Sequence, residues 1–216
     1  MTMSRPPLSR ERVVDAASRV ADAAGLGGVS MRSVGRELGV EAMSLYHHVA
    51  SKDALLDGLA DWLFTRIETP SPGGPWRAQM EVRARSARTV LAAHPWGLGL
   101  VESRRSPGPA TLRHHDAVLG CLRAAGFSVA LAAHAFSVLD AYVYGFVLTE
   151  VNLPFQPGEA AEDFVEDLGL VAAEHPHLAE MVAEQIVGRD YSYGDEFAYG
   201  LTLVLDGLEA RFRAGS

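Results

Sequence analysis

The chain has 216 residues and a formal net charge of −8 at pH 7, and this length allows one large domain or two modest domains with real cores. Hydrophobic residues make up 48% and charged residues 21% of the chain, a globular balance that argues against disorder. The single cysteine, Cys121, excludes an internal disulfide and a zinc site built on several thiolates, and it fits a reducing cytoplasm.

The sequence also argues against a membrane or secreted protein. No apolar run approaches the roughly 18 residues of a membrane span, and the first ten residues lack the apolar stretch of a secretory signal. We therefore expect a cytoplasmic protein without membrane contact. Residues 1–68 hold 8 of the 19 basic and 9 of the 27 acidic residues, so the acidity lies mostly downstream. This nearly neutral segment permits a nucleic-acid partner but does not predict one.

The first 68 residues predict four helices. Apolar side chains recur at helical spacing, and Ser9, Ser30 and Ser51 stand where N-caps of the first, second and fourth helices are expected. Glycines at 25, 27 and 28 end the first helix, and Gly39 ends the second. We expect the helices at residues 9–24, 31–38, 41–49 and 52–67.

Residues 69–75, TPSPGGP, are the clearest linker in the chain. This stretch predicts a boundary between an N-terminal domain, residues 1–68, and a C-terminal domain, residues 69–216. No segment alternates with the period of a strand, so we expect an all-α protein. The downstream helices are expected at about 76–93, 96–103, 108–125, 128–150, 159–174, 176–187 and 194–213.

Residues 30–49 read as a helix-turn-helix. Two short helices meet at Gly39, a residue that tolerates the positive φ such a turn requires. Apolar side chains lock the two helices together, namely Val34, Leu38, Val40, Leu45 and Val49. In such a motif the start of the second helix enters the major groove of DNA. The side chains that it would present there are Ala42, Met43, Ser44 and His47.

The neighbouring residues suit phosphate contacts. Lys52 is the only lysine of the chain, and it stands at the N-terminus of the fourth helix, where backbone N–H groups favour an anion. Tyr46 and His48 add a hydroxyl and an imidazole one turn away. These three residues are our candidate contacts to the DNA backbone.

Residues 38–59, LGVEAMSLYHHVASKDALLDGL, resemble the recognition region of the tetracycline-repressor (TetR) family almost position by position. Weaker similarity to the C-terminal domain of tetracycline repressors covers HPW at 94–96, CLRAAGFS at 121–128, YVYGFVLTE at 142–150, HPHL at 175–178 and FAYGLTLVLDGLEARF at 197–212. The resemblance implies a homodimeric DNA-binding regulator, most simply a repressor, that a small effector releases from a near-palindromic operator. It implies no cofactor.

The resemblance also assigns roles. Arg32 matches a residue that reaches a guanine, whereas Ala42, Met43 and Ser44 fall at base-reading positions. Tyr46, His48 and Lys52 match phosphate contacts. Helices 128–150 and 194–213 would form a four-helix bundle with their twofold mates. Their expected interface residues are Leu131, Phe136, Leu139, Val143, Phe146 and Val147 on the first helix and Phe197, Leu201, Leu205 and Leu208 on the second.

The family's effector cavity lies within the C-terminal helices, and mostly apolar pockets with a few polar groups are typical of such sites. Core packing is the alternative for each aromatic residue. His94 matches a histidine that helps to bind metal–tetracycline, but Thr149 replaces the partner glutamate, with Glu150 one residue out of register. We therefore expect no metal–tetracycline binding. The candidate effector residues are Trp62, Trp76, His94, Trp96, His114, His115, Phe136, Tyr142 and Phe146.

Other functions fit less well. His114, His115 and Asp116 are adjacent on a helix and point in different directions, so they do not converge on a metal ion. No nucleophile-elbow pattern is present, and Cys121 lies in an apolar helix, where burial favours an inert thiol. An enzyme and a helical interaction protein without DNA binding remain as alternatives, and so does an activator on the same fold.

Overall fold

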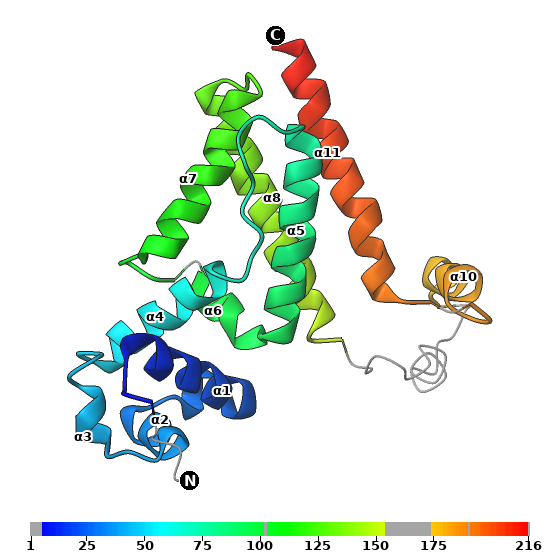
Figure 1. Ribbon diagram of the computed structural model, residues 1–216. Coiled ribbons are helices and arrows are strands. Elements are labelled where there is room, and N and C mark those ends of the chain that lie inside the picture. The colour runs from blue at the N-terminus through cyan, green and yellow to red at the C-terminus, as the bar shows by residue number, and fades with distance from the viewer. Residues whose placement is uncertain (1–5, 102, 154–173, 190, 216) are drawn as a thin grey trace.

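The computed structural model describes residues 6–101, 103–153, 174–189 and 191–215. Within these ranges the regular elements are all helices, as the sequence predicts. Figure 1 shows four helices gathered at one end of the molecule and a larger helical domain above them. We call the four helices the head. They are α1 (Arg10–Gly28), α2 (Met31–Leu38), α3 (Ala42–Leu45) and α4 (Lys52–Phe64).

Serine caps start three of the head helices, as predicted. The hydroxyl oxygens of Ser9 and Ser51 accept hydrogen bonds from the backbone N–H three residues ahead, at 3.3 and 3.1 Å. Ser30 forms a complete capping box, because Ser33 returns the bond to the Ser30 N–H at 2.9 Å. Serine replaces the usual Glu or Gln at this position, so the sequence pattern did not reveal the box.

Glycines set the turns of the head. Gly39 adopts φ 62°, the left-handed conformation predicted for the turn between α2 and α3. Gly35 is buried, and a Cβ there would lie 2.9 Å from the carbonyl oxygen of Val40, so only glycine allows this close approach. Gly25 (φ 64°) kinks α1, which then continues to Gly28. The first helix is therefore longer than the predicted 9–24.

The recognition helix is shorter than predicted. The sequence pattern extends from 41 to 49, yet α3 ends at Leu45 and the next three residues form turns. There the N–H of Tyr46 bonds to the carbonyl of Met43 at 3.3 Å, and the N–H of His48 bonds to the carbonyl of Leu45 at 2.9 Å. These three-residue bonds tighten the last turn and end the regular helix.

Most C-terminal helices lie close to their predicted positions. The prediction for 96–103 covers only a 3₁₀ turn and a short helix, and the prediction for 159–174 falls on residues 154–173, outside the described part of the chain. The elements are α5 (Trp76–Ala93), η1 (Pro95–Gly97), α6 (Leu98–Val101), α7 (Pro109–Ala124), α8 (Val129–Glu150), α10 (Pro176–Gln185), η2 (Tyr193–Asp195) and α11 (Glu196–Ala214).

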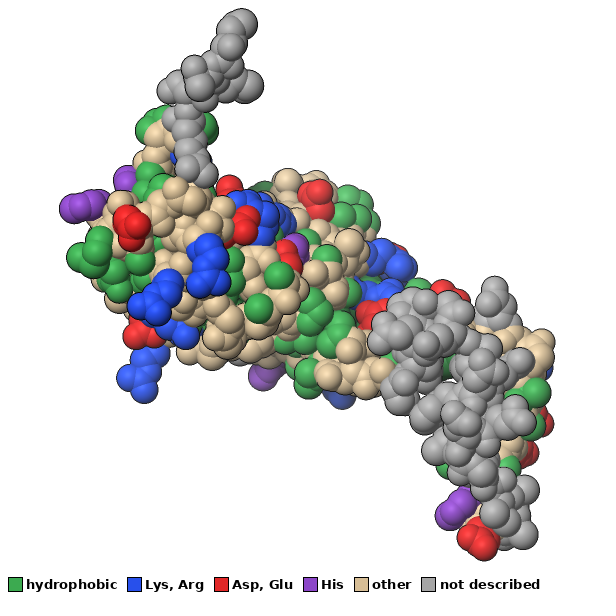
Figure 2. All heavy atoms as spheres, turned by 90° about the horizontal axis from the view of Figure 1, so that it is seen from below, with side chains coloured by type: hydrophobic (Ala, Val, Ile, Leu, Met, Phe, Trp, Pro, Cys, Tyr) green, Lys and Arg blue, Asp and Glu red, His purple; other side chains and the backbone are tan. Residues whose placement is uncertain are grey.

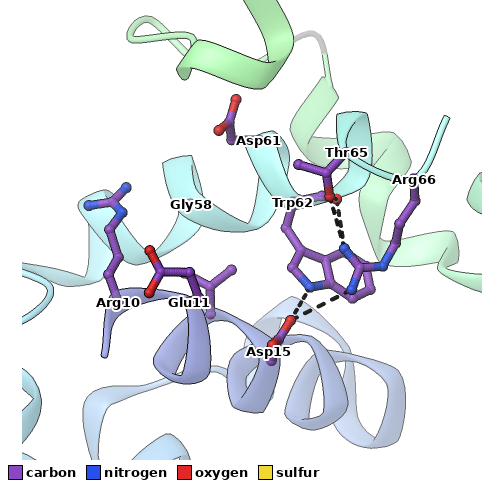
Figure 3. A pocket seen from close by; sticks show the side chains of 9 residues that line it. Arg10, Glu11, Asp15, Gly58, Asp61, Trp62, Thr65 and Arg66 are labelled. Carbon is purple, nitrogen blue, oxygen red and sulfur yellow. Dashed lines mark hydrogen bonds and ion pairs between the residues drawn. The ribbon is translucent and has the colours of Figure 1, made fainter. Parts of the chain in front are cut away.

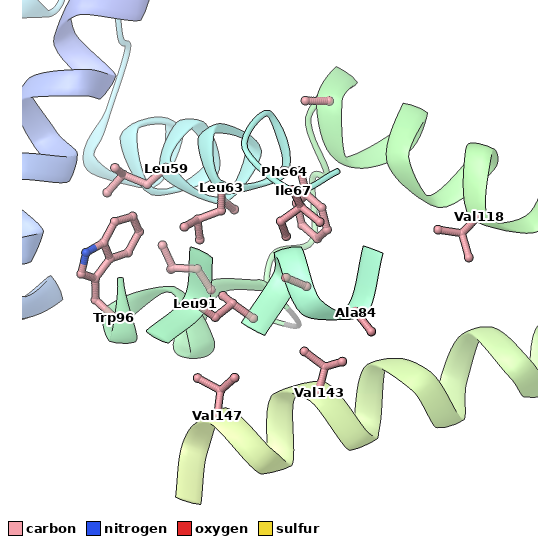
Figure 4. Packing of buried hydrophobic residues seen from close by; sticks show 14 of the residues in the cluster. Leu59, Leu63, Phe64, Ile67, Ala84, Leu91, Trp96, Val118, Val143 and Val147 are labelled. Atoms are coloured by element: carbon pink, nitrogen blue, oxygen red, sulfur yellow. The ribbon is translucent and has the colours of Figure 1, made fainter. Parts of the chain in front are cut away.

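Helix α4 joins the head to the larger domain. It packs against α1 in the head and against α6, α7 and η1 above. Leu59, Leu63 and Phe64 of α4 are buried opposite Leu91 of α5, and α8 closes the other side of α5 (Figure 4). One continuous hydrophobic core therefore includes α4 and runs through both parts of the molecule.

Helices α8 and α11 carry apolar residues on two faces. The residues that the sequence assigned to a twofold mate are in fact buried or half-buried within the protomer, with Leu139, Val143, Phe197, Leu201 and Leu205 at most 2% exposed. That assignment is corrected here. A second face remains open on both helices. Its large side chains are Val138, Leu148, Tyr199 and Leu203, which are 42–68% exposed.

Among the described residues, α8 is long and apolar enough to cross a membrane by length and composition. This differs from the sequence expectation, because interspersed residues such as Ser137 and Asp140 hide the segment from a search for continuous apolar runs. The helix packs against α5, α7 and α11 and buries the Asp140 carboxylate beside Arg83. Its composition is that of a helix in a protein core.

Candidate functional site

The base-reading candidates lie on the outer side of the head. Arg32 is exposed at the start of α2, and Met43 (73% exposed) and Ser44 project from α3, with Ala42 half-buried beside them. Leu45 is fully buried and fixes α3 against the head core. The short helix therefore holds one side in the core and leaves the other free for a partner.

The phosphate candidates border this surface. Tyr46 is 45% exposed, His47 and Lys52 are exposed, and His48 is half-buried. Lys52 is the first residue of α4, directly after the Ser51 cap. Seen from below, Lys and Arg side chains lie on the head among hydrophobic and uncharged atoms (Figure 2). The helix N-terminus and the adjacent cation together suit an anionic oxygen.

Three of the effector candidates meet at the junction of the head and the larger domain. The ring centroids of Trp62 lie 5.0 Å from those of His94 and 6.1 Å from those of Trp96. The Trp96 indole N–H donates to Asp22 of α1 at 2.6 Å, and Nδ1 of His94 lies 2.7 Å from the same oxygen. These side chains connect α1 to η1.

Trp62 also borders a cavity of about 270 Å³ between α1 and α4 (Figure 3). Its indole N–H donates to Asp15 at 2.6 Å, and the Arg66 guanidinium stacks over the ring at 3.3 Å. Burial lowers the pKa of Arg66, whereas the Asp15 carboxylate acts against that shift. The cavity is lined by residues of the head alone, both acidic and basic.

The remaining candidates occupy three other places. His115 lies 5.1 Å from Phe136, ring to ring, in the middle of the larger domain. Tyr142 and Phe146 lie 6.0 Å apart on α8, beside Phe197. Trp76 contacts Phe127 at 4.9 Å in a separate cluster. The predicted set therefore does not form one site.

Sequence reasoning missed two charged residues in the domain interior. Arg83 of α5 and His114 of α7 are each 1% exposed, and Asp140 of α8 is 5% exposed. The Arg83 Nε–H donates to His114 Nε2 at 3.1 Å, and the guanidinium pairs with Asp140. Burial, and then the neighbouring Arg83 charge, lower the pKa of His114 to about 3. The imidazole is therefore neutral.

A sequence signal for Arg83 and Asp140 exists in hindsight. Arg83 shares a helix face with Met80 and Ala87, and Asp140 shares one with Val143 and Val147, all of them buried. A charged residue on an otherwise apolar face is rarely buried without a partner. Two such residues on different helices are thus a pattern that predicts a buried ion pair.

A helix-turn-helix head joined by a shared helix to an all-helical domain defines a transcriptional regulator that binds DNA with one part and senses with the other. Two family models support this reading. Residues 13–59 match the model described as "Bacterial regulatory proteins, tetR family", and residues 69–212 match "Tetracyclin repressor-like, C-terminal domain". The chain belongs to the TetR family.

Individual relatives agree over nearly the whole chain. It is 34% identical to the HTH-type transcriptional repressor DrrR1 of Streptomyces coeruleorubidus, over 95% of this chain and 78% of that protein. It is 32% identical to the tetracycline repressor class C of Escherichia coli, over 94% and 91%. The structure of ActR from Streptomyces coelicolor in complex with actinorhodin has a TM-score of 0.78 at 30% identity, covering 95% and 97%. The chain is thus a ligand-responsive, DNA-binding transcriptional regulator and not an enzyme.

Proposed function

We propose that this protein is a cytoplasmic repressor that binds a near-palindromic operator as a homodimer and is released by a small-molecule effector. The observation that carries the proposal is the outward side of α2 and α3, where base-reading candidates are exposed around a buried anchor, Leu45. Repression needs no surface beyond this one, because a bound dimer blocks polymerase sterically. DrrR1 and the tetracycline repressors carry the name repressor.

The proposed contacts divide by role. Arg32 reads a guanine through a bidentate pair, and Met43 and Ala42 offer apolar contacts suited to a thymine methyl group. Ser44 and His47 complete the base-facing side. Tyr46, His48 and Lys52 hold the phosphates on the flank and so set the register of the head in the groove.

The dimer would form through the open faces of α8 and α11. Val138 and Leu148 on α8 and Tyr199 and Leu203 on α11 are exposed apolar residues in a single protomer. Gly145 and Gly207 also lie on open surface, with nothing within 4 Å of an added Cβ, and small residues allow helices to approach closely. Pairing by twofold symmetry would place two heads about 34–36 Å apart, one turn of DNA.

The effector would bind in the larger domain, where His115 and Phe136 lie near Tyr142 and Phe146 on α8. Trp62, His94 and Trp96 occupy the junction with the head, and Trp76 lies farther away. An activator would use the same DNA-binding and effector surfaces. A reporter gene behind the recovered operator separates the two, because loss of a repressor raises expression and loss of an activator lowers it.

The test is selection of DNA fragments by the wild-type protein, followed by binding measurements at two salt concentrations. Arg32→Ala should relax one base pair per half-site at a loss of about 1–3 kcal/mol. Lys52→Ala should weaken all sequences alike and flatten the dependence on salt. Arg85→Ala, an exposed arginine on α5, is the control and should change neither. A wild-type protein that selects no sequence would refute the proposal.

A further inference from the structure

The buried cluster of Arg83, His114 and Asp140 has unused hydrogen-bonding capacity. Beyond the ion pair between Arg83 and Asp140, four of its atoms have no hydrogen-bond partner and are shielded from solvent, namely Arg83 Nη2, His114 Nδ1 and both Asp140 carboxylate oxygens. Buried polar atoms are nearly always paired, and an unpaired group needs an explanation. Three helices, α5, α7 and α8, each supply one member, so the cluster is built by the fold.

The protonation state of the cluster defines what it can accept. His114 Nε2 receives the hydrogen from Arg83 Nε at 3.1 Å, and because the imidazole is neutral, Nδ1 carries the ring hydrogen. The cluster therefore offers two free donors, on Arg83 and His114, and the acceptor oxygens of Asp140. The positive charge of Arg83 and the negative charge of Asp140 cancel. A matching ligand group is uncharged and combines an acceptor oxygen with a neighbouring donor.

Aromatic rings surround this polar group. Phe64 lies 5.3 Å from His114 and 5.2 Å from His115, and His115 lies 5.1 Å from Phe136. Rings at these distances offer faces and edges to a flat aromatic molecule. Phe64 is also the last residue of α4, the helix whose first residue, Lys52, is the proposed phosphate contact. A molecule bound here would therefore touch the helix that carries the DNA-binding surface.

We propose that Arg83, His114 and Asp140 are the polar anchor of the effector site, and that the effector is an uncharged aromatic hydroxyketone. Its carbonyl oxygen accepts from Arg83 and His114, and its hydroxyl donates to Asp140. The inference rests on the proposed effector-responsive function. It favours neither a carboxylate ligand, which Asp140 would repel, nor a ligand that lacks the hydroxyl.

The test compares three probes that share one ring system, 1-hydroxyanthraquinone, anthraquinone and anthracene, by calorimetric titration of the dimer without DNA. We expect the hydroxyketone to bind at least 10-fold more tightly than anthraquinone and anthracene to bind weakest. Wild-type protein that binds all three alike, or none of them, overturns the proposal. This comparison needs no variant, so it stands even if a buried substitution impairs folding.

The double variant Arg83→Met/Asp140→Leu then locates the preference. It replaces both charges by apolar side chains of similar size, which buried ion pairs generally tolerate better than loss of one partner. We expect the variant to lose the 10-fold preference for the hydroxyl, as should His114→Phe. A preference retained in both variants overturns the proposal. Trp76→Phe, in a separate aromatic cluster, is the control and should keep it.

Failure of the anchor and failure of the proposed function are distinguishable. If the wild-type protein selects an operator but shows no preference among the probes, only the anchor is wrong. If it selects no DNA, the proposed function is wrong whatever the probes do. Operator binding by the double variant, measured without probe, should match the wild type within about threefold, since none of the three residues lies in the head.

Discussion

The imidazole of His114 is neutral in the folded protein, and this state makes stability depend on pH. Burial and the adjacent Arg83 lower its pKa from 6.5 to about 3. An unfolded chain exposes the same imidazole to water, where it takes up a proton near pH 6.5. Between these two values the unfolded state binds more protons than the native state, so stability falls as the pH falls.

The corresponding prediction concerns the free energy of unfolding at pH 7 and pH 5. His114 should contribute a loss of about 2 kcal/mol over this interval, since each pKa unit corresponds to about 1.4 kcal/mol. His114→Gln should remove that part of the dependence, whereas His177→Gln, whose side chain is 96% exposed, should keep it. Denaturant titrations at one fixed protein concentration measure this, because dimerisation also affects apparent stability. Equal pH dependence in wild type and His114→Gln would contradict the prediction.

Single residues also show what the sequence could and could not predict about the site. Arg32, Met43 and Lys52 were predicted from one local motif, and the structure leaves all three exposed on the head. The aromatic effector candidates are spread over four places, because an apolar pattern indicates burial without naming the partner. Arg83 and Asp140 were missed, since their pairing joins residues far apart in the chain.

At the scale of elements, local signals predicted where helices begin better than where they end. Ser9, Ser30 and Ser51 cap their helices through bonds to residues three positions ahead, and such signals are readable from sequence. The end of α3 is set by turns that follow Leu45, which an apolar pattern continuing to Val49 does not reveal. Helix α8 is apolar on two faces, so periodicity cannot separate its core face from its open face.

The open face of α8 and α11 supports a prediction about assembly. Leu203→Glu should weaken the dimer, because twofold symmetry brings two copies of the charge into one apolar interface. At about 2 kcal/mol for each copy of an interface residue, the dimer dissociation constant should rise about 1000-fold. Val82→Glu is the matched control, since Val82 on α5 is equally exposed at 56%. Analytical ultracentrifugation distinguishes the two, and a stable Leu203→Glu dimer would place the interface elsewhere.

At the scale of the whole molecule, two carboxylates of α1 connect the head to the elements above it. Asp15 accepts the indole N–H of Trp62 in α4, and Asp22 accepts that of Trp96 in η1, both at 2.6 Å. The two aspartates are seven residues apart and so lie on the same face of the helix. These bonds fix the orientation of α1 relative to the larger domain. Because a dimer must present two heads at a fixed separation, we infer that they also fix the spacing of the heads.

This inference predicts the effect of removing one indole N–H. Trp96→Phe keeps an aromatic ring but loses the bond to Asp22, and hydrogen bonds to charged groups contribute about 1.5–3 kcal/mol. Heads that move more freely lose more entropy on binding two half-sites, so operator affinity should fall about 10-fold, or about 1.4 kcal/mol. Affinity for a duplex with a single half-site should not change, and Trp76→Phe should affect neither duplex. An equal loss on both duplexes would instead mean that Trp96 stabilises the head itself, and no loss on either would mean that the bond to Asp22 does not set the spacing.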